Sequence, residues 1–116
     1  MDHKIVIVAF AGEPSCFAHA LLNGLDMQAR GWDVKLVIEG RATALVNELA
    51  EPEAPFAPLY DKAKKSGLID CVCRACAKKM GSLAAAEAQG LPLADEMQGH
   101  PAMARYLEAG YTVITI

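Results

Sequence analysis

The feature that most constrains the fold is an unbroken apolar run near the start of the chain, residues 5–10. Four of its six residues are β-branched, which favours an extended strand. A strand with one solvated face alternates apolar and polar residues, so an unbroken run indicates burial on both faces, as in a parallel sheet. A turn at residues 12–15 and apolar residues at helical spacing follow, until Gly31 ends the predicted helix.

Predicted strands and helices continue to alternate along the rest of the chain. Residues 33–39 predict a second strand and residues 42–49 a short helix, whereas three prolines within residues 52–58 exclude regular structure there. The remaining predicted elements are a helix at 59–66, a strand at 68–73, helices at 75–80 and 82–89, a short strand at 91–93, a helix at 101–109 and a strand at 111–116. Strands that alternate with helices predict an open, mostly parallel α/β sheet covered on both faces.

Length and composition limit the classes of protein that fit this chain. Its 116 residues match one domain, spanning residues 1–116. Because 53% of the residues are hydrophobic and only 22% are charged, we expect apolar surface to be buried between copies in a homo-oligomer. The net charge of −3 and the lack of a basic stripe argue against binding to nucleic acid.

The sequence also predicts a cytoplasmic location. The N-terminus shows no export signal, and no apolar stretch reaches the roughly 18–20 residues that cross a bilayer, so we expect no membrane association. In a reducing cytosol, the four cysteines are expected to serve as thiols or metal ligands rather than as structural disulfides.

Cys73 is the strongest candidate for a reactive group. It ends the third predicted strand, and ligands of parallel sheets collect outside the carboxyl ends of the strands. The start of the next helix, together with Arg74, Lys78 and Lys79, places positive charge after it. Positive charge favours the thiolate, which is the nucleophilic form, so we expect an activated thiol.

The neighbouring cysteines receive different interpretations. Strand alternation places Cys71 on the same face as Cys73 and Asp70 on the opposite face, so Cys71 is interpreted as a packed core residue. Cys76 lies three residues after Cys73, a spacing that suits a disulfide, shared metal ligation or resolution of a persulfide.

Other candidate site residues come from the first loop and from the histidines. Cys16 follows the first strand, on the same edge of the sheet as Cys73, and Glu13 is placed to tune a thiol or to bind a substrate. His19 falls within the first helix and His100 stands before a proline. Either histidine could act as a base or ligand if it faced the edge of the sheet, but a solvated or hydrogen-bonded role is favoured for both.

The segment 72–81, which reads VCRACAKKMG, resembles DsrE/DsrF/TusD-like proteins, in which a strand ends in a cysteine and a short helix runs to a basic residue and glycine. Residues 4–8 and 106–114 are similar to the first and last strands of that family. The resemblance implies a three-layer α/β/α sandwich with a five-stranded, mainly parallel sheet, assembled into dimers, trimers or hexamers. The chain departs from the pattern at Met80, where the family usually has arginine, and at Cys76, which many relatives lack.

The resemblance further implies a persulfide carrier, since in sulfur-relay members the cysteine that matches Cys73 accepts sulfane sulfur and passes it to a partner protein. On this hypothesis Cys76 is a second thiol, and Arg74, Glu13 and Cys16 lie near the substrate. Partners would be sulfur donor and acceptor proteins, with no metal and no cofactor. The alternatives are a non-catalytic binding or assembly module with zinc-bound or packed cysteines, and a dithiol oxidoreductase that uses Cys73 and Cys76.

Overall fold

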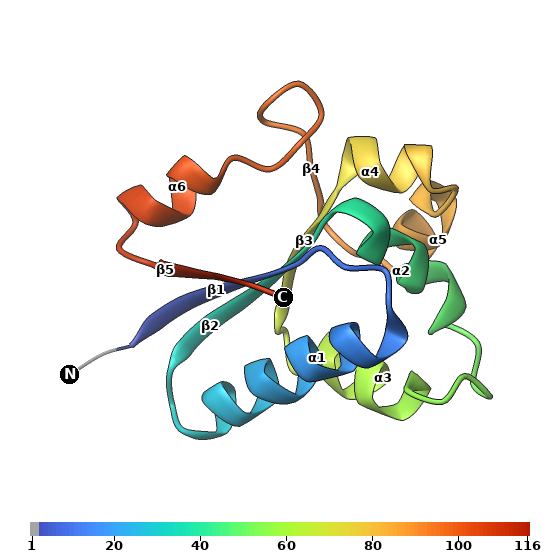
Figure 1. The fold of residues 1–116 in the computed structure, drawn as a ribbon, viewed down its shortest axis with the longest axis horizontal. Helices are drawn as coiled ribbons and strands as arrows, with labels where there is room; N and C mark the ends of the chain where they lie inside the picture. Colours follow the sequence, from blue (N-terminus) through green and yellow to red (C-terminus); the bar gives the residue numbers. More distant parts are fainter. Residues whose placement is uncertain (1–2) are drawn as a thin grey trace.

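The structure, a computed structural model that describes residues 3–116, is built on a five-stranded sheet (Figure 1). All neighbouring strands are parallel, in the order β4-β3-β2-β1-β5. The strands are β1 (Lys4–Ala9), β2 (Asp33–Ile38), β3 (Ile69–Cys73), β4 (Leu93–Ala94) and β5 (Thr112–Thr115). The predicted α/β class and the five-stranded parallel sheet are confirmed.

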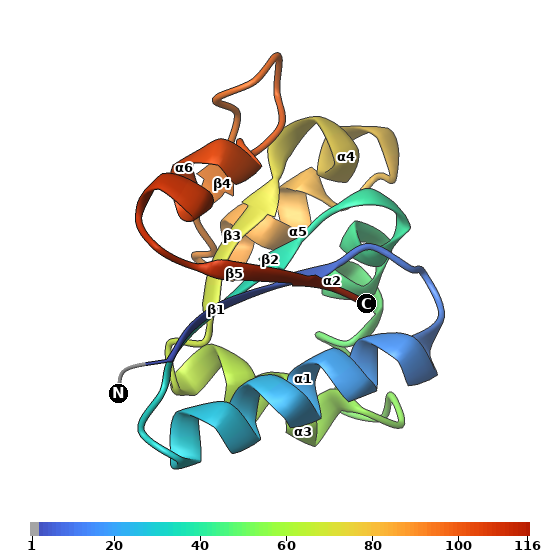
Figure 2. The ribbon, with the colours of Figure 1, turned by 60° about the vertical axis from the view of Figure 1, so that its left-hand side comes forward.

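The helices cover the two faces of the sheet unequally, as Figures 1 and 2 show. Helices α1 and α3 lie on one face with α2 and α5 nearby, whereas α6 lies on the other, so the architecture is a three-layer sandwich. The helices are α1 (Pro14–Ala29), the 3-10 helix η1 (Gly40–Thr43), α2 (Ala44–Glu48), α3 (Ala57–Lys65), α4 (Arg74–Lys79), α5 (Leu83–Ala88) and α6 (Met103–Glu108). Within residues 3–116, none of these helices has the length and apolar composition needed to cross a bilayer.

One expectation about the proline-rich segment is wrong. Helix α3 begins at Ala57, so Pro58 lies in a helical turn and not in an irregular connection. Proline is tolerated there because the N–H groups of the first turn have no partner within the helix, and its fixed φ suits the helical backbone. The prolines therefore exclude regular structure only before Ala57.

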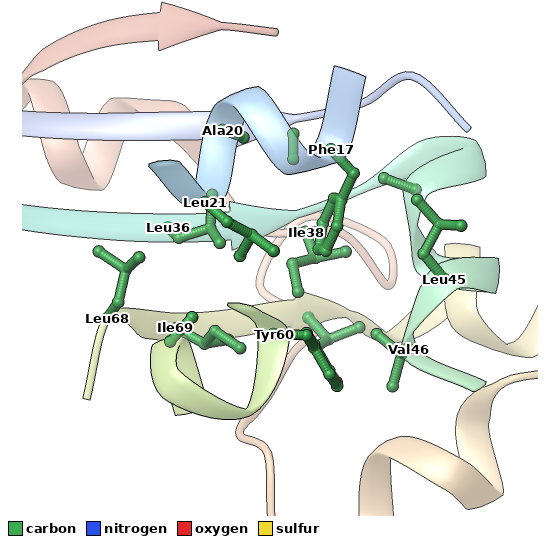
Figure 3. Close-up of a cluster of buried hydrophobic side chains, with 14 of the residues drawn as sticks. Phe17, Ala20, Leu21, Leu36, Ile38, Leu45, Val46, Tyr60, Leu68 and Ile69 are labelled. Atoms are coloured by element: carbon green, nitrogen blue, oxygen red, sulfur yellow. The ribbon is translucent and has the colours of Figure 1, made fainter. Parts of the chain in front are cut away.

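The larger hydrophobic core lies between the sheet and the layer that contains α1 and α3 (Figure 3). Phe17 of α1, Leu36 of β2 and Tyr60 of α3 are almost completely buried in it. The Tyr60 hydroxyl donates a hydrogen bond to Gln89 at 2.7 Å, which satisfies its polar end. This core fixes β1, β2 and β3 side by side, and their carboxyl ends therefore lie along one edge of the sheet.

A smaller core on the opposite face corrects the predicted orientation of β3. The register between β2 and β3 shifts next to Asp70, so strict alternation fails at this point. The Tyr106 hydroxyl of α6 donates to the Asp70 carboxylate at 2.5 Å and lies 3.4 Å from the Cys71 sulfur. Asp70 and Cys71 therefore face the same side, contrary to the prediction that placed them on opposite faces. Cys71 is buried, as predicted.

Candidate thiol site at the end of strand β3

Cys73 occupies the junction between β3 and α4. It is the last residue of the strand and the N-cap of the helix, and its sulfur accepts a hydrogen bond from the Cys76 N–H at 3.4 Å. The Cys73 thiol also donates a hydrogen bond to the Gly99 carbonyl oxygen, at 3.7 Å from the sulfur. Cys73 has no solvent-exposed area, so a bulky reagent cannot reach it directly.

His100 joins this junction from a distant part of the chain. Its Nδ1 lies 3.0 Å from the Cys73 sulfur and 3.6 Å from the Cys76 sulfur. A proton can pass between either thiol and this nitrogen, because both distances fall within the range of hydrogen bonds to sulfur. The structure thus places a Cys-x-x-Cys pair around one imidazole.

A tight turn holds His100 in this position. Met97 and His100 exchange two backbone hydrogen bonds, of 2.8 and 3.0 Å, and Gly99 between them has a φ of +93°. The Ala75 N–H of α4 donates to the Gly99 carbonyl at 2.8 Å, which ties the turn to the helix. A Cβ atom at position 99 would lie 2.9 Å from the Ala75 Cβ, so only glycine permits this close approach.

Burial raises the pKa of the Cys73 thiol to about 12, and its side-chain hydrogen bond to Cys76 acts in the same direction. The Cys76 N–H, which stabilises a thiolate, opposes this shift. Burial therefore favours the thiol form of Cys73, against the preference for thiolate that the helix start and the nearby cations predict. Lys78, which was expected to favour the thiolate, is exposed to solvent, where its charge is screened. Attack by Cys73 thus requires a base, and His100 is in place to accept the proton.

A cavity of about 600 Å³ opens next to the thiols. Cys76 and His100 line it, whereas Cys73 lies behind them. The complete lining is Phe10, Gly40, Arg41, Ala75, Cys76, Lys79, Met80 and His100. The site is therefore built from the carboxyl ends of β1, β2 and β3 together with the turn before α6.

The structure brings together only some of the residues that the sequence singled out. Cys73 and Cys76 are adjacent, as their spacing predicts. Glu13 and Cys16 lie at the start of α1, and exposed Arg74 begins α4. Among residues 3–116, none of these three belongs to the lining of the cavity. Their predicted contact with substrate stays a prediction.

Two contributors to the site do not follow from the sequence pattern. A hydrogen-bonded role is favoured for His100, but its position beside Cys73 is not predicted, and Arg41 is not singled out by any motif. The signal for His100 was the Gly-His-Pro sequence, in which glycine permits a tight turn, but nothing local shows that this turn docks on α4. Arg41 lies in η1, just after the carboxyl end of β2. Because β2 is the neighbour of β3, this position places Arg41 at the same edge of the sheet as Cys73.

The same three side chains form a potential metal site. The ligand atoms of Cys73, Cys76 and His100 all lie within 4.8 Å of one another. Two sulfurs and one imidazole nitrogen are typical zinc ligands, and Cys76 and His100 line the cavity, from which a fourth ligand could come. The site can therefore serve either as a group of reactive thiols or as a metal-binding group.

Comparisons with known proteins agree with this architecture. The sequence matches the profile of the DsrE/DsrF-like family over residues 1–116. An uncharacterized protein of Methanocaldococcus jannaschii is 29% identical over 99 residues, which cover 84% of this chain and 78% of that protein. An uncharacterized protein of Archaeoglobus fulgidus is 37% identical over 51 residues, covering 44% of this chain and 84% of that protein. A conserved protein of unknown function from Bacteroides thetaiotaomicron has the same fold, with a TM-score of 0.69 at 15% identity over 97% of this chain and 95% of its own.

Proposed function

Because the chain belongs to the DsrE/DsrF-like family, we propose that it is a sulfur-transfer protein that carries sulfane sulfur as a cysteine persulfide. The observation that carries the proposal is the position of Cys73, at the end of β3, beside a second thiol and an imidazole. In the transfer, a thiol of the site attacks the outer sulfur of a donor persulfide, R–S–SH. A Cys–S–SH forms, and R–SH leaves with the proton that the thiol gave up, so no external oxidant or reductant is needed.

The burial of Cys73 supports storage of sulfur. A persulfide exposed to water is open to attack by small thiols and oxidants, whereas one at the end of β3 is shielded by the protein. His100 can return a proton to the departing thiol when the sulfur is passed on, because its Nδ1 lies within 4 Å of both sulfurs. The acceptor would be a thiol of a partner protein, and the donor another persulfide.

The test is to incubate the protein with inorganic polysulfide, remove the excess and measure the intact mass. We expect a gain of one sulfur atom, which cyanide then removes as thiocyanate. The gain should disappear in the double variant Cys73→Ser/Cys76→Ser and persist in Cys71→Ala, which removes a thiol outside the cavity. A wild-type protein that gains no sulfur, or a double variant that gains as much as the wild type, would contradict the proposal.

A second candidate function is zinc binding, since the ligand atoms of Cys73, Cys76 and His100 form one compact group. This function would make the chain a binding or assembly module rather than a carrier. Cobalt titration separates the two, because a tetrahedral site with two thiolates gives intense visible bands. Bands that reach saturation at one cobalt ion per chain and vanish in His100→Ala would favour metal binding.

We also propose that the chain functions in the cytoplasm as a homo-oligomer. Several large apolar side chains are exposed, including Leu22, Met97 and Leu107, each more than half accessible. Strand β5 is at the edge of the sheet, and within residues 3–116 no strand pairs with its outer side, so a second copy can cover it. Sedimentation analysis should show a dimer, trimer or hexamer, and a monomer at micromolar concentration would contradict this proposal.

A further inference from the structure

The two thiols of the site differ in access to the cavity. Cys76 is partly exposed and lines the cavity, while Cys73 has no exposed area. A donor that enters the cavity therefore meets the Cys76 sulfur first. The Cys73 sulfur lies behind it, in contact with the Cys76 N–H and with His100. The strand-end cysteine thus has no direct path to a donor in this arrangement.

The charges around the cavity indicate the kind of donor that fits. Arg41 and Lys79 line it, and no carboxylate does so in the described part of the chain. Within residues 3–116, neither cation takes part in a salt bridge. Glu39, which precedes Gly40, is a nearby acidic group, and burial raises the pKa of its carboxyl, although the charge of His100 acts in the opposite direction. A bound anion can therefore neutralise the positive charges of Arg41 and Lys79.

The size and remaining surface of the cavity limit the donor further. A volume of about 600 Å³ falls in the range of roughly 300–1,000 Å³ that holds small molecules. Phe10 and Met80 give it apolar walls, which suit the soft, weakly hydrated sulfur atoms of a polysulfide chain. A donor with a charged end and a sulfur chain matches both kinds of surface.

We propose that Cys76 receives the sulfur, from a small anionic persulfide or polysulfide that binds between Arg41 and Lys79. The proposal rests on the proposed sulfur-transfer function and adds the entry residue and the class of donor. The Cys76 sulfur attacks the outer sulfur of the donor and the outer S–S bond breaks, so that a Cys76 persulfide forms and the donor leaves shortened by one sulfur. The proton of the Cys76 thiol moves to the departing thiolate, with His100 Nδ1 as the nearby relay.

An internal transfer then delivers the sulfur to Cys73. The Cys73 thiol attacks the outer sulfur of Cys76–S–SH, which gives Cys73–S–SH and the Cys76 thiol. The step conserves sulfur atoms, electrons and protons. The sulfur atom moves only a short distance, because both cysteine sulfurs lie within 4.8 Å of each other and of His100 Nδ1. Cys76 is the entry thiol in this scheme, and Cys73 is the storage thiol.

The sequence offers a direct way to follow the order of transfer. Trypsin cleaves after Arg74 and Lys78, so Cys73 lies in the peptide of residues 66–74 and Cys76 in that of residues 75–78. The protein is mixed with inorganic polysulfide, quenched at successive times in denaturant with an alkylating agent, and digested. Fragmentation separates Cys73 from Cys71 in the longer peptide. Persulfide should appear first on Cys76 and later on Cys73.

Substitution of the entry thiol tests the same order. In Cys76→Ser and Cys76→Ala, the rate at which persulfide appears on Cys73 should fall about tenfold or more, because the donor loses its accessible nucleophile. Two results would overturn the proposal while leaving the sulfur-transfer function intact. One is persulfide that appears on Cys73 before Cys76, and the other is loading of both Cys76 variants at the wild-type rate. A wild-type protein that gains no sulfur would overturn the function itself.

The anionic character of the donor has its own test. Arg41→Gln and Lys79→Gln should each raise the polysulfide concentration for half-maximal loading rate several-fold, with a larger effect in the double variant. Lys78→Gln removes the same charge from an exposed neighbour outside the lining and serves as the matched control. A half-maximal concentration unchanged in the Arg41/Lys79 double variant, or raised equally in the control, would overturn the assignment of the donor class.

Discussion

The close contact between the turn at Gly99 and helix α4 makes Gly99→Ala the most informative single substitution. The new Cβ would lie 2.9 Å from the Ala75 Cβ, and alanine would have to adopt a φ of +93°. Left-handed backbone costs a non-glycine residue about 1–2 kcal/mol. The Ala75 side chain is too short to move aside, so the turn must separate from α4 and lose the hydrogen bond between Ala75 and Gly99, worth about 1 kcal/mol.

The sum of these two terms is about 2–3 kcal/mol of unfolding free energy, which for a domain of this size lowers the melting temperature by about 8–12 °C. Gly31→Ala is the matched control, since Gly31 has a φ of +82° but no atom within 4 Å of a built Cβ. Gly31→Ala incurs only the cost of the left-handed backbone, so its melting temperature should fall by about 4–8 °C. Differential scanning calorimetry measures both variants.

The same substitution should also affect function, because it moves His100 away from the Cys73 sulfur. We expect polysulfide loading measured below the melting transition to slow in Gly99→Ala and to stay at the wild-type rate in Gly31→Ala. If Gly99→Ala melts at the same temperature as the control and loads sulfur at the wild-type rate, the contact with Ala75 does not position His100, and the reasoning is refuted.

Three further predictions follow from burial and hydrogen bonding. With a small alkylating agent at neutral pH, Cys76 should react about tenfold or more faster than Cys73, which is buried and has a raised pKa; equal rates would show that Cys73 is accessible. Tyr106→Phe should lower the free energy of urea unfolding by about 1–3 kcal/mol, because the Asp70 carboxylate loses a donor; an unchanged value would mean that water replaces the hydroxyl. Leu36→Ala should cost about 2–5 kcal/mol in the same measurement, because Leu36 has no exposed area; a loss below 1 kcal/mol would indicate that the core collapses around the gap.

Most of the fold could be predicted from the sequence because the central strands β1, β2 and β3 are largely buried. The apolar run of β1 has no polar alternation and β2 ends in an apolar run, residues 36–38, which together indicate a parallel sheet, and glycines after the helices mark their ends. The errors arise where one residue breaks a periodic rule. The irregular register beside Asp70 reverses the face of that residue, and Pro58 lies in a helical turn where proline is tolerated.

The candidate site could be predicted only in part. Cys73 and Cys76 are close in sequence, so their proximity follows from the start of a helix. His100 lies 27 residues after Cys73, and its approach depends on the turn at Gly99 and its contact with Ala75, which no local pattern encodes. The opposing effect of burial on the Cys73 thiol could not be predicted for a related reason, since burial depends on the whole fold.

The order of the strands has a consequence for how the chain is made in the cell. Strand β1 pairs with β2 on one side and with β5 on the other, so residues more than 100 positions apart complete its hydrogen bonds. During synthesis, β1 through β4 leave the ribosome before β5, and one edge of the apolar β1 then exposes unpaired N–H and C=O groups. Such an edge is a template for pairing with another nascent chain. A chain truncated before Thr112 would therefore leave this edge of β1 open to pairing with another chain, and β5 closes it.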